Sequence, residues 1–193
     1  HGFDMFTGQR CVIGRFDELG LRPVVALETE SYLIDPKLDE HGRPALVCNP
    51  VTGRTQRETQ VYSIQEIDDF APIFDAIAAA AAAQGLPADA AVAEYAPGQF
   101  EVNLRHVDNP LLACDQLVLL RRLIRGVARQ HGLDATFMAK PFAGLAGSGL
   151  HAHVSLVDAN NANVCAGDGD FGESPLLRQC VAGLLETMTE CTL

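Results

Sequence analysis

The stretch RPVVALETESYLID, residues 22–35, decides how this chain folds. Successive side chains of a strand point to opposite faces, and the alternation of residue types in this stretch predicts one long β-strand. Glu28 and Glu30 then share one face with Ala26. The opposite face holds residues that suit burial, namely Leu27, Thr29, Ser31 and Leu33. The strand therefore presents two carboxylates on one side and a core-facing surface on the other.

Two amphipathic segments further along the chain predict helices. Apolar residues recur at helical spacing over about 65–84, behind Ser63 and Glu66, which have the spacing of a capping box. Pro72 marks a late start or a kink in this helix. The second helix covers about 110–131, with a proline at its first position and a glycine just past its end.

Four short strands complete the expected fold: 90–95, 99–106, 135–139 and 150–157. Residues 36–60 carry little periodicity and indicate a loop excursion, to which we assign no chemistry. The order β, α, ββ, α, ββ predicts the α+β class, with a largely antiparallel sheet and helices packed on one side.

Composition and charge narrow the class of protein. The chain has 193 residues, of which 48% are hydrophobic, and this composition predicts a folded protein. Its formal net charge of −11 would repel nucleic acid and anionic membranes, so neither is an expected partner. No apolar stretch is long enough to cross a membrane, and no signal peptide is expected. The six cysteines are widely spaced without a C-x-x-C pair, which favours reduced thiols and a cytoplasmic location.

Both ends of the chain look cut. The sequence opens at His1 without an initiator methionine and stops at Leu193 within an amphipathic pattern that runs over about 176–188. We therefore expect a piece of a larger protein. Its apolar C-terminal stripe predicts poor solubility or self-association of the piece alone.

A tight turn at Pro97 and Gly98 would set Glu94 directly opposite Glu101. Like charges that face each other destabilise a sheet, so solvent, a shared proton, a basic neighbour or a metal ion must offset the repulsion. Glu28 and Glu30 add a second pair of acids on one face. Four glutamates on two strand regions are more than a solvated face usually carries.

His151, His153 and Ser155 share one face of a predicted strand that follows the glycine-rich segment 144–149. A lone histidine in a strand is usually a core residue, whereas H-x-H beside a glycine-rich turn is more typical of a ligand set. Hard oxygen ligands with one imidazole suit Mg²⁺ or Mn²⁺ better than structural Zn²⁺, and two-cation sites usually handle phosphates. The glycines match neither a Rossmann nor a Walker loop.

Basic residues give weaker signals. Lys140 ends a strand at the edge of the glycine-rich segment and would reach either an anion or solvent. Four arginines lie on one flank of the second helix, where we expect a solvated or salt-bridged face: Arg121, Arg122, Arg125 and Arg129.

Three ordered segments, ALETESYL (26–33), EYAPGQFEVNLRH (94–106) and ATFMAKPFAGLAGSGLHAHVSL (135–156), resemble successive signatures of the glutamine synthetase family. Within it, the sequence is most similar to the branch that contains gamma-glutamylpolyamine synthetases. The resemblance implies that residues 1–193 are the central part of the catalytic domain. An N-terminal β-grasp domain and the C-terminal part of the catalytic domain would then be absent.

The resemblance also implies roles for individual residues. Glu30, Glu94 and Glu101 would hold one divalent cation, Mg²⁺ or Mn²⁺. Glu28 and His151 would hold a second, with a glutamate from beyond residue 193. The remaining implied contacts are to ATP, from His153, Ser155 and Asp89, and to the glutamate substrate, from the backbone at Gly147.

The implied reaction is an ATP-dependent ligation, in which the γ-carboxylate of glutamate becomes an acyl phosphate that an amine then displaces. No protein nucleophile is needed, so we assign no catalytic residue. Glutamine-forming members usually have asparagine where Ala146 stands, which favours a polyamine or other organic amine, with ammonium as the alternative. Such an enzyme would serve nitrogen metabolism and polyamine catabolism. The piece alone would be inactive.

Two other interpretations stay open. A pseudoenzyme would keep the acidic cradle for metal and nucleotide without turnover. A metal hydrolase built on H-x-H would use His151 and His153 but leave both glutamate pairs idle. The resemblance further implies a large homo-oligomer whose active sites are shared between subunits.

Overall fold

The computed structural model describes residues 5–59 and 61–190, and the chain divides into two compact units. The sheet unit comprises residues Ala26–His106 and Leu112–Ala152. The terminal unit comprises His1–Val25, Val107–Leu111 and His153–Leu193. Each unit is described by itself.

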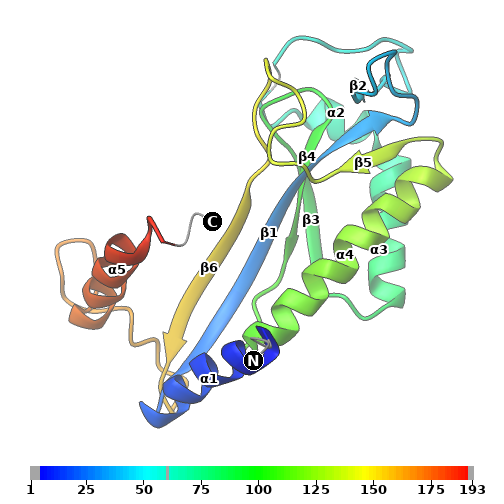
Figure 1. Cartoon of the computed structure of the whole chain (residues 1–193). Helices are drawn as coiled ribbons and strands as arrows, with labels where there is room; N and C mark the ends of the chain where they lie inside the picture. Colours follow the sequence, from blue (N-terminus) through cyan, green and yellow to red (C-terminus); the bar gives the residue numbers. More distant parts are fainter. Residues whose placement is uncertain (1–4, 60, 191–193) are drawn as a thin grey trace. The chain divides into compact units, whose positions relative to one another are not determined.

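Six strands form one sheet with the order β2-β1-β4-β3, while β5 and β6 also pair with β1 (Figure 1). The pairings of β1 with β2, β4 and β5, and of β3 with β4, are antiparallel. The predicted α+β class with a largely antiparallel sheet is therefore confirmed. The strands are β1 (Arg22–Asp35), β2 (Ala45–Leu46), β3 (Ala88–Ala93), β4 (Gln99–Leu104), β5 (Asp134–Thr136) and β6 (Leu150–Val157).

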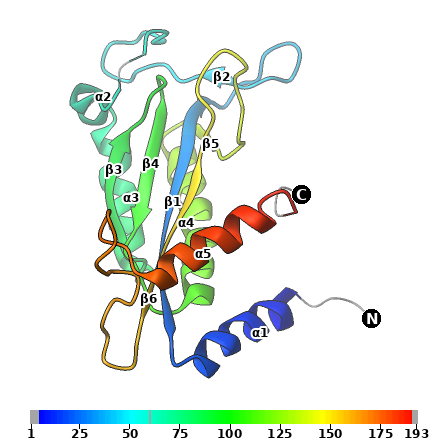
Figure 2. The ribbon, with the colours of Figure 1, turned by 90° about the vertical axis from the view of Figure 1, so that its left-hand side faces the viewer.

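Helices α3 (Ala71–Ala83) and α4 (Pro110–Gln130) lie against one face of the sheet (Figure 2). The core between sheet and helices is apolar; its most buried members include Leu33, Phe100, Leu120 and Ile124. At about 25 cal/mol per Å² of apolar surface, this burial is the main stabilising contribution to the unit.

Strand β1 alternates as its sequence predicts. Leu27, Thr29, Ser31 and Leu33 are buried, whereas Glu28 and Glu30 are half-buried on the other face. Near its end the strand is buried on both faces, because Tyr32 and Ile34 form a second apolar cluster with Ala96. Residues of the glycine-rich segment pack against this second cluster, as do Leu46 and Phe142.

The single helix predicted over 65–84 is wrong, because the structure has two helices that meet at Phe70. The first is α2 (Ile64–Asp69), and the Ser63 hydroxyl accepts a hydrogen bond from the Glu66 N–H at 3.2 Å, as in a capping box. Pro72 lies in the first turn of α3, where a missing N–H costs nothing. Pro72 therefore acts as the start of a new helix.

The predicted pairing of Glu94 with Glu101 is also wrong. Strand β4 pairs Glu101 with Val92, and the Glu94 N–H donates to the carbonyl of Gln99 at 2.8 Å. The strand pairing is thus not centred on Pro97 and Gly98, although a tight turn does run over residues 96–99, with glycine in the third position at φ +72°. A shift of two residues leaves Glu94 on the same face as before.

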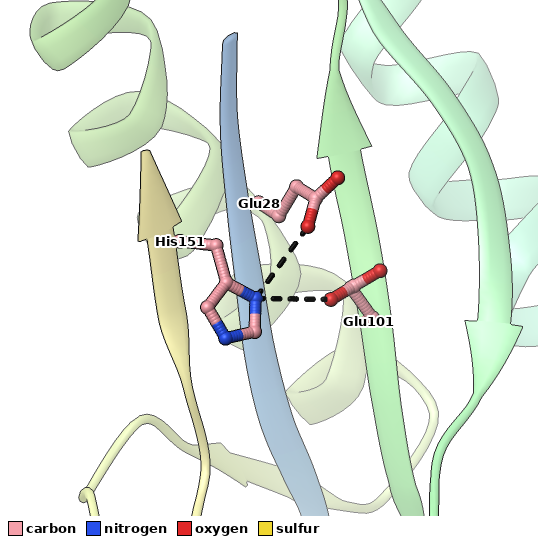
Figure 3. Close-up of side chains that lie close together, drawn as sticks. All are labelled: Glu28, Glu101 and His151. Atoms are coloured by element: carbon pink, nitrogen blue, oxygen red, sulfur yellow. Dashed lines mark ion pairs between the residues drawn. The ribbon is translucent and has the colours of Figure 1, made fainter. Parts of the chain in front are cut away.

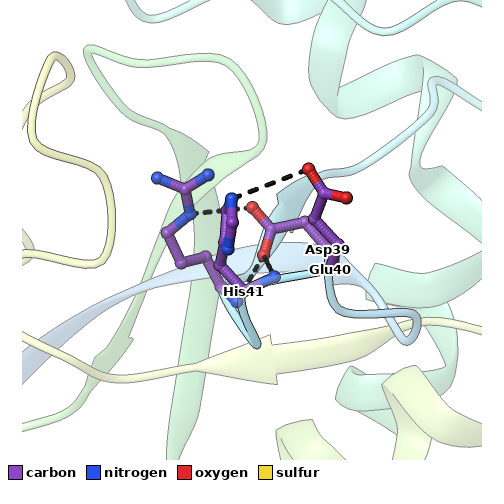
Figure 4. Close-up of polar contacts among 4 residues, drawn as sticks. Asp39, Glu40 and His41 are labelled. Atoms are coloured by element: carbon purple, nitrogen blue, oxygen red, sulfur yellow. Dashed lines mark hydrogen bonds and ion pairs between the residues drawn. The ribbon is translucent and has the colours of Figure 1, made fainter.

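The excursion over residues 36–59 is held by local turns. The Asp39 carboxylate accepts hydrogen bonds from the N–H groups of His41 and Arg43 and from the Arg43 guanidinium, each at 2.8 Å (Figure 4). These hydrogen bonds, the Arg43 N–H foremost, lower the pKa of Asp39. The His41 imidazole lies 3.6 Å from the Glu40 carboxylate. This exposed cluster is satisfied within its own turn.

The terminal unit contains α1 (Met5–Glu18) and α5 (Pro175–Thr187). The amphipathic pattern near residue 180 does form a helix, and its apolar side chains are exposed, among them Leu184 and Leu185. None of the helices in the described residues has the length and hydropathy that a membrane span requires. Free thiols are Cys48, Cys114, Cys165 and Cys180, while the side chains of Cys11 and Cys191 lie outside the described part of the chain.

Candidate metal and substrate site

Glu28, Glu101 and His151 converge on one point of the sheet (Figure 3). One potential ligand atom from each lies within 4.8 Å of the others. The Nδ1 atom of His151 is 3.5 Å from a Glu28 carboxylate oxygen and 4.0 Å from one of Glu101. Two carboxylates and an imidazole at this separation have the chemistry of a divalent-cation cradle.

The sheet register explains why these side chains meet. Glu30 lies directly opposite Glu101 in the β1–β4 pairing, and Glu28 lies two residues away on the same face of β1. On the other side of β1, the Glu30 N–H donates to the carbonyl of Gly149 at 3.1 Å. This bond aligns the start of β6, and therefore His151, with the two glutamates.

The acids of this face are electrostatically coupled. Burial raises the pKa of Glu101, and the carboxylates of Glu28 and Glu30 raise it further, although a hydrogen bond with Asn103 acts against them. Burial likewise raises the pKa of Glu94, with additional contributions from Glu30 and Glu101. The nearby His151 opposes these increases in part, and the pKa values of both glutamates remain raised. A cation at this place would relieve a repulsion that the fold itself creates.

Gly149 is the point of closest approach within the site. A β-carbon at this position would lie 2.9 Å from Glu30 Oε1 and 2.9 Å from the His151 ring atoms Cε1 and Nε2. Any larger residue would require the ends of the Glu30 and His151 side chains to shift. The donor types, their mutual repulsion and the glycine at their contact all fit a bound divalent cation.

The glycine-rich loop, residues 144–149, is tied down by three side chains that donate to three successive carbonyls. Lys140 donates to the Leu145 carbonyl, the Tyr32 hydroxyl to the Ala146 carbonyl at 2.7 Å, and the Gln99 amide to the Gly147 carbonyl at 2.9 Å. Lys140 therefore braces the loop in this structure. Burial raises the pKa of Tyr32 to about 12, so its hydroxyl remains a donor at neutral pH.

Gly147 makes a second close approach. A β-carbon there would lie 2.8 Å from the Ala139 carbonyl oxygen, which also accepts from the Ser148 N–H at 2.9 Å. The loop backbone is thus folded tightly onto the end of the preceding segment. Its exposed position leaves Gly147 open to a ligand.

Gln99 is a site residue that the sequence reasoning missed. Its side chain is 1% exposed, and its amide nitrogen donates to Glu30 Oε2 at 2.8 Å as well as to the Gly147 carbonyl. The available signal was its position two residues before Glu101, on the same face of the strand.

The other predicted site residues lie apart from this cluster or in the other unit. Asp89 lies in β3, with its carboxylate 3.8 Å from Arg105. His153 and Ser155 continue β6 in the terminal unit. Among the arginines of α4, Arg121 and Arg125 stack on Phe137, and Arg129 pairs with Asp134 at 3.1 Å.

Comparison with known proteins gives the family. A family model described as the catalytic domain of glutamine synthetase matches residues 9–193. The chain belongs to the glutamine synthetase family.

Its relatives include a gamma-glutamylputrescine synthetase and a glutamine synthetase. The chain is 45% identical to gamma-glutamylputrescine synthetase PuuA of Escherichia coli (strain K12), covering 88% of this chain and 36% of PuuA. It is 32% identical to type-1 glutamine synthetase 1 of Dictyostelium discoideum, covering 92% and 35%. A solved structure, a GmaS/ADP complex, superposes with a TM-score of 0.79 at 29% identity, covering 93% and 39%. The chain thus spans little more than a third of the length of these relatives.

Proposed function

We propose that this chain is the central part of the catalytic domain of an ATP-dependent ligase that joins the γ-carboxylate of glutamate to an organic amine. The observation that carries the proposal is the convergence of Glu28, Glu101 and His151 on one face of the sheet, beside Glu30. Family membership supports the reaction class.

In this proposal Glu30, Glu94 and Glu101 hold one divalent cation, Mg²⁺ or Mn²⁺, and Glu28 and His151 contribute to a second. The carboxylate oxygens and single imidazole suit these hard ions. When bound, the cations neutralise the charge of the transferring phosphoryl group. The register pairing of Glu30 with Glu101 supports a shared role for these two residues.

The remaining residues bind and orient the substrates. His153, Ser155 and Asp89 are proposed to contact ATP, and the exposed backbone at Gly147 is proposed to contact glutamate. The aligned γ-carboxylate attacks the terminal phosphate of ATP, which forms an acyl phosphate and releases ADP. The amine then attacks the acyl carbon and displaces phosphate. Positioning and electrostatics supply most of the rate in such a transfer, so no protein nucleophile is required.

Ala146 bears on the choice of amine. Its side chain packs toward the apolar cluster of Tyr32, Ile34 and Ala96, where the carboxamide of an asparagine would lose its hydrogen bonds. The loop of this chain is therefore built for an apolar residue at this position. The 45% identity to a gamma-glutamylputrescine synthetase supports a polyamine over ammonium.

The test is ATP-dependent phosphate release by the whole protein with glutamate and Mg²⁺, comparing putrescine, spermidine, ethanolamine and ammonium. We expect turnover with an organic amine and little with ammonium. Turnover with ammonium alone would replace the proposal with a glutamine synthetase. A hydrolytic activity that does not depend on ATP would indicate the metal hydrolase. ATP binding without turnover of any amine would indicate a pseudoenzyme.

A matched pair of variants assigns the activity to this site. Glu28→Gln removes a carboxylate of the cluster, whereas Glu58→Gln removes an exposed one in the excursion. We expect the first to abolish phosphate release and the second to leave it unchanged. We further propose that the whole protein is a cytoplasmic homo-oligomer with sites shared between subunits, which sedimentation of the whole protein would test.

A further inference from the structure

The side chain of Gln99 connects three segments that lie far apart in the sequence. Its amide nitrogen donates to Glu30 Oε2 on β1 at 2.8 Å and to the Gly147 carbonyl in the glycine-rich loop at 2.9 Å. Its amide oxygen accepts from the Ala96 N–H in the hairpin turn at 3.2 Å. A buried amide whose donors and acceptor are all used is fixed in one orientation.

Neither the isosteric acid nor an apolar side chain of similar volume makes this set of contacts. A glutamate at position 99 has no N–H group to donate and would place a second carboxylate against Glu30. A methionine fills a similar volume but leaves the Gly147 carbonyl and the Ala96 N–H without their partner. The primary amide is therefore required for its two donors.

Tyr32 provides a natural comparison, because it also donates to the glycine-rich loop. Its hydroxyl bonds the neighbouring carbonyl, that of Ala146, at 2.7 Å. Gln99 differs in that the same nitrogen also bonds a carboxylate of the candidate metal site. Tyr32 thus holds the loop, whereas Gln99 holds the loop and Glu30 to each other.

We propose that Gln99 is a positioning residue that sets the glycine-rich loop, and with it the glutamate substrate, relative to Glu30 and the cations. This inference rests on the proposed ligase function. Gln99 touches neither reactant, and it acts through Glu30 and Gly147. The alignment of the γ-carboxylate with ATP then depends on one buried amide.

The expected effect follows from geometry. Displacement of a substrate by about 1 Å costs on the order of 100-fold in rate, and loss of a partner that orients a metal ligand costs about 10–100-fold in metal affinity. Gln99→Met therefore lowers kcat/KM for glutamate by about 100-fold and weakens Mn²⁺ binding by at least about 10-fold. Tyr32→Phe raises KM for glutamate but leaves Mn²⁺ affinity within about threefold.

The experiment uses the whole protein and three readouts: steady-state kinetics with glutamate varied, Mn²⁺ affinity by paramagnetic resonance, and hydrogen exchange over residues 140–149. The amides of Leu145 and Ser148 report on the loop, because they bond the carbonyls of Phe142 and Ala139. Gln130→Leu, at an exposed position on α4, is the matched control. It should match the wild type in all three measurements.

The result that supports the proposal is faster loop exchange in both Gln99→Met and Tyr32→Phe, with weaker Mn²⁺ binding in Gln99→Met alone. Wild-type exchange and Mn²⁺ affinity in Gln99→Met would overturn it. If Gln99→Met does not fold, Gln99→Asn keeps a neutral amide on a side chain one carbon shorter, which cannot reach Glu30, Gly147 and Ala96 together, and it is judged by the same criteria. A wild-type protein that ligates no amine would refute the proposed function, while exchange and Mn²⁺ binding would still judge Gln99.

Discussion

Two glutamates of the sheet unit, one buried and one half-buried, have different surroundings. Glu66 on α2 is 3% exposed, and its carboxylate accepts a hydrogen bond from the Gly98 N–H at 2.8 Å. Glu101 on β4 is surrounded by the carboxylates of Glu28 and Glu30 and by His151. Burial raises the pKa of both groups.

The difference lies in what satisfies the charge. At Glu66 the protein supplies donors: the Gly98 N–H bonds Glu66, and the neighbouring Asp69 carboxylate, which also raises the pKa of Glu66, accepts from Asn49 and Gln65. At Glu101 the neighbours are two further carboxylates and an imidazole on one face of the sheet. Burial and a neighbouring acid therefore do not by themselves indicate a ligand site, whereas the meeting of several potential ligand atoms at one point does.

The distinction between Glu66 and Glu101 is tested most strongly by neutralising each glutamate in turn. Glu101→Gln should lower Mn²⁺ affinity of the whole protein by at least about 100-fold, because even partners outside the metal's own ligands contribute about 10–100-fold. Glu66→Gln should leave the affinity within about threefold. Isothermal titration with Mn²⁺ measures both, and equal losses in the two variants would refute the distinction.

Gly149 tests whether crowding at the cluster matters. Gly149→Ala places a methyl group 2.9 Å from Glu30 Oε1 and His151 Nε2. Both atoms are the ends of side chains that can move aside, so the substitution should cost little stability but should weaken Mn²⁺ binding by displacing two potential ligands. Gly126→Ala, in α4, meets no atom within 4 Å and should stabilise the protein by up to about 1 kcal/mol without changing Mn²⁺ affinity. Denaturant unfolding and Mn²⁺ titration measure both variants, and an unchanged Mn²⁺ affinity in Gly149→Ala would mean that the spacing at this glycine does not set the site.

The sequence predicted the parts of this site that depend on strand period. Strand β1 has the predicted bounds, and over residues 22–31 it has the predicted faces, because alternation over this length leaves one way to bury the apolar side. His151 was placed correctly on a strand after the glycines for the same reason. The family followed from three ordered motifs, and the match over residues 9–193 confirms it.

Contacts that depend on the turn type and on packing were missed. The register of Glu94 was off by two residues, since the length of a loop around Pro97 and Gly98 depends on hydrogen bonds that residue types do not specify. Glu66 has capping-box spacing, but its carboxylate bonds Gly98, 32 residues away. Gln99 is buried by tertiary packing that no local pattern encodes.

The N-cap of α2 tests whether the surroundings of Glu66 support only the fold and not the metal site. Ser63→Ala removes the acceptor for the Glu66 N–H and should cost about 1 kcal/mol of stability. Mn²⁺ affinity should not change, because the helix end holds Glu66 and not the cluster. Thermal unfolding and Mn²⁺ titration of the whole protein check this, and a weaker affinity would instead connect the cap to the metal site.

The pH dependence of stability gives the smallest and most specific test. Because burial raises the pKa of Glu66 above its ordinary value of 4.5, the folded state holds this proton more tightly than the unfolded state does. The folded state is therefore favoured at low pH, and this contribution is lost as the pH rises from 4.5 through the raised pKa.

Glu66→Gln keeps an oxygen for the Gly98 N–H but has no proton to lose. Its free energy of unfolding should consequently fall less than that of the wild type between pH 4.5 and pH 8. The carboxyls with lowered pKa, such as Asp39, give an opposite slope, but they are present in both proteins and cancel in the difference. Urea unfolding of metal-free protein across this range measures the two slopes. Parallel slopes would mean that Glu66 loses its proton as readily in the folded protein as in the unfolded chain, and its burial would then carry no electrostatic cost.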